Sequence, residues 1–192
     1  MNSVKYVNKL NSLTLTLAII KPDVVAHPRR CQAIKQVMLD NKFYFVRSQE
    51  KQLLRSEAEI FYAIHKEKFF FNRLAGFMSS GPLSAHILAR HDAIAHWRHL
   101  MGPTKTFRAK HDAPDSLRAR FGLTDTRNAT HGSDSPETAK IEMEFFFPDF
   151  NVDDWYRDQE PSFRSGNVKY CDEKNEHYII KDVIDDKEFP DS

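Results

Sequence analysis

The amino-acid sequence predicts an α/β (α+β) sandwich, in which a ferredoxin-like, four-stranded antiparallel sheet packs against helices. Strand-like segments alternate with helical ones in the order β-α-β-(α)-β-α-β. The short spacing between the second and third strands favours a split β-α-β sheet over a doubly wound parallel one. A chain of 192 residues with 41% hydrophobic content is large enough for one domain with a full core.

The four predicted strands are apolar runs bounded by turn residues. Residues 13–20 alternate Leu and Thr and then become wholly apolar, which is typical of a central strand. Residues 43–46 form a second run that could continue to residue 54, and residues 83–89 form a third. Short turn and strand material in residues 121–130 leads to His131. No run is long enough to cross a bilayer, so no membrane span is expected.

The predicted helices lie between these strands, and several carry recognisable start signals. They cover residues 28–39, a segment from residue 56 through Ile64, a turn at residues 74–78, residues 93–101 and a segment from residue 136 through 145. Ser56 and Glu59 match the S-x-x-E pattern of a capping box. Asp92 and Ser135 stand where N-caps are expected, and Pro136 fits the first helical position.

Two segments show no clear periodicity. Residues 104–116 have a loop-like, basic composition. Residues beyond Phe150 are polar and charged, and we expect an appended tail that is partly ordered at best. The expected organisation is therefore a flexible N-terminus at residues 1–12, one domain at residues 13–150 and a C-terminal extension at residues 151–192.

Composition narrows the class of protein. The net charge of +1 and the pI of about 7.8 disfavour a dedicated nucleic-acid binder, which would be far more basic. The two cysteines are too few for a disulfide scaffold and favour a reducing compartment. Lys5 and Lys9 precede the first acidic residue, Asp23. This order of charges is a faint signature of a mitochondrial targeting segment, and it fits a frayed polar N-terminus equally well. We expect an intracellular protein, either mitochondrial or cytoplasmic.

The segment 128–135, Asn-Ala-Thr-His-Gly-Ser-Asp-Ser, carries the clearest chemical signal. His131 lies between strand material and a capped helix, beside short oxygen-bearing side chains. A neutral imidazole nitrogen is nucleophilic at physiological pH and can accept a phosphoryl group. Glu142, eleven residues later, could reach back and fix the tautomer of the ring. The ordinary alternative for a single histidine is a packed or exposed polar residue.

Three cations could complete a phosphate site. Lys21 follows the first strand, Arg98 lies on the helix before Gly102, and Arg118 follows the loop-like segment. Converging cations would suit a triphosphate, although each taken singly is typical of a solvated surface charge. The sequence contains neither a P-loop nor a G-x-G-x-x-G motif, so side chains would have to hold the phosphates. The histidines within residues 91–99 lack H-E-x-x-H spacing and do not predict a zinc site.

These residues resemble a known family. The segment 128–135 is similar to the active-site signature of nucleoside diphosphate kinases, and residues 18–23 are similar to the family's first strand with its lysine. Further matches in the expected order are Phe61-Tyr62, Phe69-Phe70, Ser80-Gly81-Pro82, Trp97-Arg98, residues 101–104, Leu117-Arg118 and Glu142. The resemblance covers roughly residues 13–150 and is strongest to the type-six branch of the divergent second group.

The resemblance implies the ferredoxin-like fold and a two-step transfer of the γ-phosphate of ATP to nucleoside and deoxynucleoside diphosphates. His131 would be the phosphorylated nucleophile, with Glu142 hydrogen-bonded to it. Lys21 and Tyr62 would act near the γ-phosphate and the sugar hydroxyl. The other implied nucleotide contacts are Phe70 with the base, Arg98, Thr104 and Arg118 with the phosphates, and Asn128 with the ribose. Mg²⁺ would be held mainly by the nucleotide phosphates, so no protein metal ligand is assigned.

The sequence departs from the family at four places. Ile64 replaces a commonly acidic residue, the loop at residues 104–114 is lengthened, and the C-terminal extension replaces a short terminus. At the fourth place Pro136 stands where valine is common, which costs little at the first position of a helix. The family's hexamers pack this loop at their centre, so the lengthened loop argues against a homohexamer. An alternative function is a nucleotide-binding or partner-binding module with weak or no turnover. A third is transfer from phosphohistidine to protein side chains.

Overall fold

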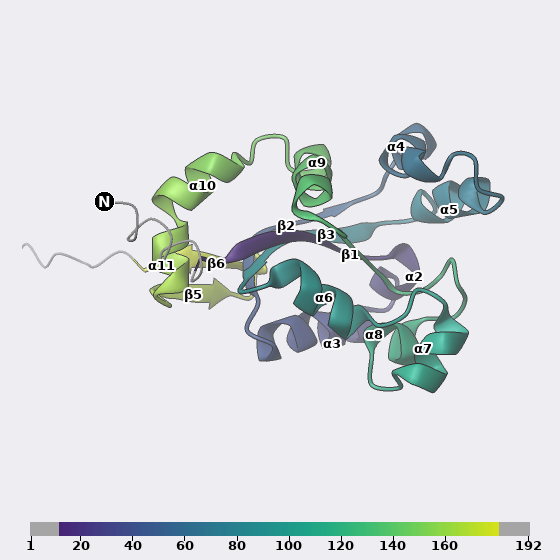
Figure 1. Ribbon diagram of the computed structural model, residues 1–192, viewed down its shortest axis with the longest axis horizontal. Helices are drawn as coiled ribbons and strands as arrows, with labels where there is room; N and C mark the ends of the chain where they lie inside the picture. Colours follow the sequence, from purple (N-terminus) through teal and green to yellow (C-terminus); the bar gives the residue numbers. More distant parts are fainter. Residues whose placement is uncertain (1–11, 181–192) are drawn as a thin grey trace, which may run out of the picture.

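The computed structural model describes residues 12–180, which form one four-stranded antiparallel sheet with helices on both faces (Figure 1). The strands are β1 (Thr14–Ile20), β2 (Tyr44–Lys51), β3 (Leu83–Arg90) and β4 (Thr130–Gly132). Their order is β2-β3-β1-β4, and β1 pairs antiparallel with both β3 and β4. The predicted ferredoxin-like sandwich is therefore confirmed.

Alternation along β1 separates the core into two layers. Leu15, Leu17 and Ile19 pack on one face, whereas Ala18 and Ile20 pack on the other. The first face is covered by α4 (Arg55–Phe61), α5 (Phe71–Met78) and α9 (Pro136–Phe146), and the second by α3 (Pro28–Asp40), α6 (Ala93–Met101) and α8 (Leu117–Phe121). Because strand side chains point alternately to opposite faces, the mixed Leu/Thr and apolar run of β1 suits a strand buried on both sides.

The N-terminal boundaries of two helices differ in how well they were predicted. Ser135 caps α9 as expected, since its hydroxyl accepts a backbone hydrogen bond from the first turn. The predicted pairing of Ser56 with Glu59 is wrong. The N-cap of α4 is Leu54, two residues earlier, and the Glu57 carboxylate accepts from the backbone N–H of Leu54. Both registers offer a glutamate three residues after the N-cap, so spacing alone did not distinguish them.

The start of α6 also differs from the simple capping expectation. Asp92 precedes the helix as predicted, but its backbone is left-handed and its side chain does not cap it. The N–H of Ala93 donates instead to the hydroxyl of Thr14 on β1. This contact ties the first turn of α6 to the sheet.

The predicted loop at residues 104–116 is wrong in part, because it contains the helix α7 (Thr106–Asp112). Thr106 and Ala109 are its buried residues and lie three positions apart. Two small residues within seven give too weak an apolar stripe to indicate a helix from sequence. Two other short elements lie elsewhere in the chain. They are α2 (Pro22–Val25) after β1 and the 3-10 turn η1 (Ala63–His65) after α4.

The C-terminal extension is folded, contrary to the expectation of partial order, in all the residues described beyond Phe150. It forms α10 (Val152–Asp158), α11 (Glu160–Arg164) and a hairpin of β5 (Val168–Cys171) and β6 (Glu176–Ile179). Trp155 and Phe163 are each 1% exposed and join the core layer that also contains Leu15. Charged neighbours on the outer helical faces hid this burial in the sequence.

The hairpin covers the outer edge of β2, which is an edge strand of the main sheet. The backbone N–H of Phe45 donates to His177 Nδ1 at 2.9 Å, and that of Ser48 donates to Glu176 Oε1 at 2.7 Å. The Ser48 hydroxyl also donates to the carbonyl of Asn175. Side chains of the extension thus satisfy edge groups that would otherwise face water or another strand.

Two expectations concern features outside this architecture. Within residues 12–180, no helix combines the length and the apolar character that crossing a membrane requires. The suggested targeting segment falls on residues 1–12, of which all but the last lie outside the described part of the chain.

Candidate active site

His131 lies in the middle of β4, paired with Ile19 of β1 and just before the helix α9. Its Nε2 is 2.8 Å from Glu142 Oε1 on α9, so the predicted contact with Glu142 is present. The Ser133 hydroxyl donates to Glu142 Oε2 at 2.6 Å and accepts from the backbone N–H of Leu17 at 3.2 Å. The chain of contacts fixes both the carboxylate and the ring. The role of Ser133 was missed, although it stands in the signature segment.

This arrangement decides which ring nitrogen of His131 is available. An ionised carboxylate only accepts hydrogen bonds, so Nε2 bears the proton that points to Glu142. The other nitrogen, Nδ1, therefore carries the free lone pair of the neutral ring. The geometry thus leaves Nδ1 as the ring nitrogen that is not engaged by Glu142.

Aromatic rings pack beside the imidazole. Phe61 and Tyr62 at the end of α4 lie 5.3 and 5.9 Å from His131, centroid to centroid, and His65 stacks on Tyr62 at 6.4 Å. Burial, reinforced by the charge of Glu142, raises the pKa of Tyr62 well above its ordinary value. Tyr62 therefore remains a neutral phenol that can donate a hydrogen bond.

Lys21 directly follows β1, at the end of the strand that pairs with β4. Its Nζ donates to Asn128 Oδ1 at 2.6 Å and to the Thr126 carbonyl at 3.3 Å. Burial, together with the nearby charge of Arg118, lowers the pKa of Lys21 to about 7, while Asp23 opposes the shift. The ammonium is thus near its titration midpoint at neutral pH and would gain from an anionic partner.

Arg118 on α8 reaches toward the strand that carries the histidine. Its Nη1 donates to the carbonyl of Gly102 at 2.8 Å and to Thr104 Oγ1 at 3.3 Å, and its Nη2 donates to the carbonyl of Thr130 at 3.3 Å. Burial and then Arg98 lower the pKa of Arg118 to about 10, so the guanidinium stays charged at neutral pH. Thr104 also accepts from Asn128 through its carbonyl.

Three buried polar groups near His131 lack a hydrogen-bond partner in the described part of the chain. They are the hydroxyl of Tyr62, Nε of Arg118 and the hydroxyl of Thr130. Leaving such groups unpaired costs about 1–3 kcal/mol each. Each can donate a hydrogen bond, so these groups could bind the oxygens of an anionic ligand such as a phosphate.

The remaining predicted residues lie farther out. Phe70, directly before α5, packs against His65 with centroids 5.5 Å apart. Arg98 is exposed on α6 and lines a separate cavity of about 700 Å³ together with Asp134 and Lys140. The structure thus joins seven of the nine predicted residues through direct contacts or the shared charge cluster, and places Phe70 and Arg98 at its rim. Those joined are Lys21, Tyr62, Thr104, Arg118, Asn128, His131 and Glu142.

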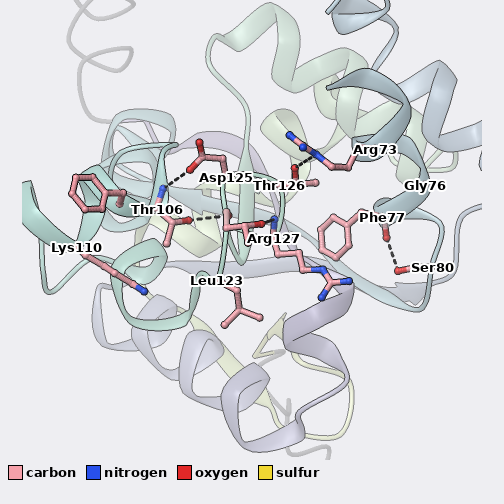
Figure 2. Close-up of a pocket in the computed structure, with 12 residues that line it drawn as sticks. Arg73, Gly76, Phe77, Ser80, Thr106, Lys110, Leu123, Asp125, Thr126 and Arg127 are labelled. Carbon is pink, nitrogen blue, oxygen red and sulfur yellow. Dashed lines mark hydrogen bonds between the residues drawn. The ribbon is translucent and has the colours of Figure 1, made fainter. Parts of the chain in front are cut away.

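The larger cavity, of about 890 Å³, lies between α5, α7 and the segment 123–127 (Figure 2). None of the predicted site residues lines it. It is nevertheless adjacent to the site, because Arg73 Nε donates to the Thr126 hydroxyl while the Thr126 carbonyl holds Lys21. The cavity and Lys21 therefore share one neighbour, Thr126.

The donor set does not form a metal centre. No group of three or more His, Cys, Asp or Glu side chains suited to a metal ion occurs within residues 12–180. The buried groups around His131 are mainly cations and hydroxyls, which fit phosphate oxygens.

Structural comparison defines the class of protein first. A solved nucleoside diphosphate kinase from Aquifex aeolicus superposes with a TM-score of 0.68 at 38% identity, covering 71% of this chain and 96% of that chain. One from Encephalitozoon cuniculi gives a TM-score of 0.66 at 27% identity, covering 70% and 88%. The fold of this chain is thus the one found in solved nucleoside diphosphate kinases.

The family follows from sequence comparison. The model of the nucleoside diphosphate kinase family matches residues 14–152, and the chain belongs to this family. Nucleoside diphosphate kinase 6 of Danio rerio is 51% identical, covering 88% of this chain and 97% of the relative. The human protein of the same name is 53% identical, covering 88% and 90%. The resemblance to the type-six branch is confirmed.

Proposed function

We propose that this protein is an active nucleoside diphosphate kinase that works through a phosphohistidine. In the first half-reaction, Nδ1 of His131 attacks the γ-phosphorus of a nucleoside triphosphate. An N–P bond forms as the bond to the β–γ bridging oxygen breaks, and the diphosphate leaves with that electron pair. In the second half-reaction, a terminal oxygen of another nucleoside diphosphate attacks the phosphorus and releases the neutral imidazole.

The residues around His131 have distinct proposed roles. Glu142 holds the Nε2 proton and stabilises the positive charge that the ring gains when Nδ1 is phosphorylated. Lys21, Arg118 and the Tyr62 hydroxyl face the charge that develops on the transferred group and its leaving oxygen. Bound Mg²⁺ would supply further charge neutralisation at the phosphates. Asn128 and Thr104 contact the nucleotide directly, with Phe70 and Arg98 at the outer end.

One observation carries this proposal. The contact from His131 to Glu142 continues through Ser133 to the backbone of Leu17 without a gap. A module that only binds nucleotides has no need to fix the tautomer of a histidine. The intact series of hydrogen bonds supports chemistry at Nδ1.

A labelling experiment tests the proposal. The purified chain is incubated with γ-labelled ATP, separated from nucleotide and chased with GDP. We expect an acid-labile label on the protein that passes to GTP. His131→Ala should take no label, whereas His111→Ala, which removes an exposed histidine on α7, should behave as the native chain does. An acid-labile label on His131→Ala would refute the assigned role.

The second candidate function is a nucleotide-binding or partner-binding module, and the substitution at Ile64 motivates it. Ile64 lies in η1 with 84% of its surface exposed, so it does not fill the site. Nucleotide binding without label would favour the module. A label that passes to added proteins while GDP fails to compete would favour protein phosphotransfer.

Assembly is also open to a direct test. The lengthened loop contains the helix α7, and we propose that it prevents the homohexamer. Size-exclusion chromatography with light scattering should give a mass well below six chains. A hexamer mass would contradict this.

A further inference from the structure

Trp97 on α6 contacts the backbone of the candidate nucleophile. It is fully buried, and its indole Nε1 donates to the carbonyl of His131 at 3.0 Å. The imidazole side chain points to the opposite face, where Glu142 and Tyr62 lie. His131 is therefore held from both faces of the sheet, through its ring on one side and its carbonyl on the other.

The strand register shows what the indole adds. Antiparallel partners alternate between hydrogen-bonded and non-bonded pairs. The N–H of Lys21 donates to the Ala129 carbonyl, and the N–H of Ser133 donates to the Leu17 carbonyl. His131 lies two residues from each, so its pairing with Ile19 falls at a hydrogen-bonded position. The indole occupies the second lone pair of a carbonyl that already belongs to the ladder.

The short strand explains why this second bond matters. The strand β4 has three residues and a single strand neighbour, β1. Gly132 lies directly against Trp97, because a Cβ at this position would overlap the indole and crowd Met101. The ring of Phe43 lies nearly perpendicular to the indole, with centroids 6.3 Å apart. Trp97 thus has one available position, and that position sets where the backbone of His131 lies.

We infer that Trp97 is a positioning residue for His131, one that holds Nδ1 in line for phosphoryl transfer. The inference rests on the proposed function and adds a residue to its machinery. Misplacing a nucleophile by a fraction of an ångström slows reaction without weakening substrate binding. Loss of the indole N–H should therefore lower the rate of phosphorylation and leave nucleotide affinity unchanged.

The chain supplies a matched control. Trp155 is the other tryptophan and is equally buried, and its Nε1 has no hydrogen-bond partner among residues 12–180. The variants Trp97→Phe and Trp155→Phe both remove an indole N–H and similar volume from the core. A third protein carries Trp155→Phe and replaces Trp97 by benzothienylalanine, which keeps the ring shape with sulfur in place of N–H. This third protein decides the matter if Trp97→Phe does not fold.

Two measurements are made on each protein. The first is the rate of label uptake from γ-labelled ATP, together with the nucleotide Kd. We expect Trp97→Phe and the benzothienyl protein to be about three- to tenfold slower, the equivalent of one hydrogen bond, with Kd within about twofold. Trp155→Phe should match the native rate within about twofold.

The second measurement is the set of ring ¹⁵N chemical shifts of His131, which report the tautomer and the contact with Glu142 without turnover. They should move in the two Trp97 proteins and stay in place in Trp155→Phe. Equal rates and equal shifts across all the variants would overturn the inference. If the native chain takes no label, the proposed function fails, and the shifts alone then decide whether Trp97 positions the ring.

Discussion

The His131 end of the sheet and the C-terminal extension are held by opposite kinds of interaction. Around His131, polar side chains contact one another across distant parts of the chain, as in the contact of Lys21 with Asn128. The extension is anchored by the buried rings of Trp155 and Phe163 and by side chains that satisfy the edge of β2. The site around His131 requires particular residue types. The extension requires mainly apolar side chains that fill the core and polar groups that cover the edge of β2.

This difference separates chemistry from stability. Changes near His131 should alter phosphoryl transfer more than folding, and changes in the extension should do the reverse. Both regions are tied to β1. Leu17 of β1 exchanges hydrogen bonds with Ser133, through its backbone N–H and its carbonyl. The backbone N–H of Leu13, just before β1, donates to Glu160 of α11. The extension is thus part of the domain that carries the site.

The largest expected effect is on stability, from Trp155→Ala. Removing a fully buried indole should lower the free energy of unfolding by about 3–5 kcal/mol. Phosphoryl transfer measured well below the unfolding transition should remain within about threefold of native. Urea unfolding measures the first quantity. Phe107→Ala, at an aromatic side chain that is 82% exposed, is the control and should cost about 1 kcal/mol or less.

Arg118→Lys should produce the largest chemical effect. Lysine keeps the positive charge but cannot make the three contacts of the guanidinium with Gly102, Thr104 and Thr130. We expect label uptake to slow by about a hundredfold. Arg120→Lys, two residues along on the same helix and exposed, should leave it unchanged. Similar rates for both variants would place Arg118 outside the chemistry.

Glu176→Ala tests the edge contact of the hairpin. The backbone N–H of Ser48 loses its acceptor, which should lower the free energy of unfolding by about 1–2 kcal/mol. Hydrogen exchange at Ser48 should accelerate, while label uptake stays the same. Glu173→Ala, an exposed glutamate of the same hairpin, serves as the matched control. Unchanged exchange at Ser48 would mean that the hairpin does not protect β2.

The smallest expected effect is on pH dependence, through Lys21. Its folded-state pKa of about 7 lies below the ordinary lysine pKa of 10.5, so the free protein loses this charge as pH rises through 7. Nucleotide affinity should therefore fall about two- to tenfold between pH 7 and 8.5. Because the unfolded chain keeps that proton longer, the contribution of Lys21 to stability rises over the same range. Calorimetric titrations with nucleotide measure this affinity at each pH. For Lys21→Arg the affinity should stay the same between pH 7 and 8.5, because arginine keeps its charge over this range.

The predictability of each region follows from the same contrast. The apolar runs at residues 13–20 and 83–89 and the segment 128–135 predicted the strands and the histidine site, because burial and reactive side chains leave local patterns. Glu142 was predicted from its distance along the following helix, and its contact is present.

Other features leave no local pattern. Trp155 and Phe163 lie in different short helices, so their joint burial depends on the sheet they meet. The contact of Trp97 with the His131 carbonyl joins a side chain to the backbone of a distant strand, and no residue type at position 131 would reveal it. Both are products of tertiary packing.

The most direct test of the central claim is to identify the atom that carries the phosphate. The chain labelled with ¹⁵N-histidine is phosphorylated by a nucleoside triphosphate, and phosphorus–nitrogen coupling locates the bond by NMR. The hydrogen bond from Nε2 to Glu142 predicts phosphate on Nδ1 of His131. Phosphate on Nε2, or on any other residue, would contradict the account.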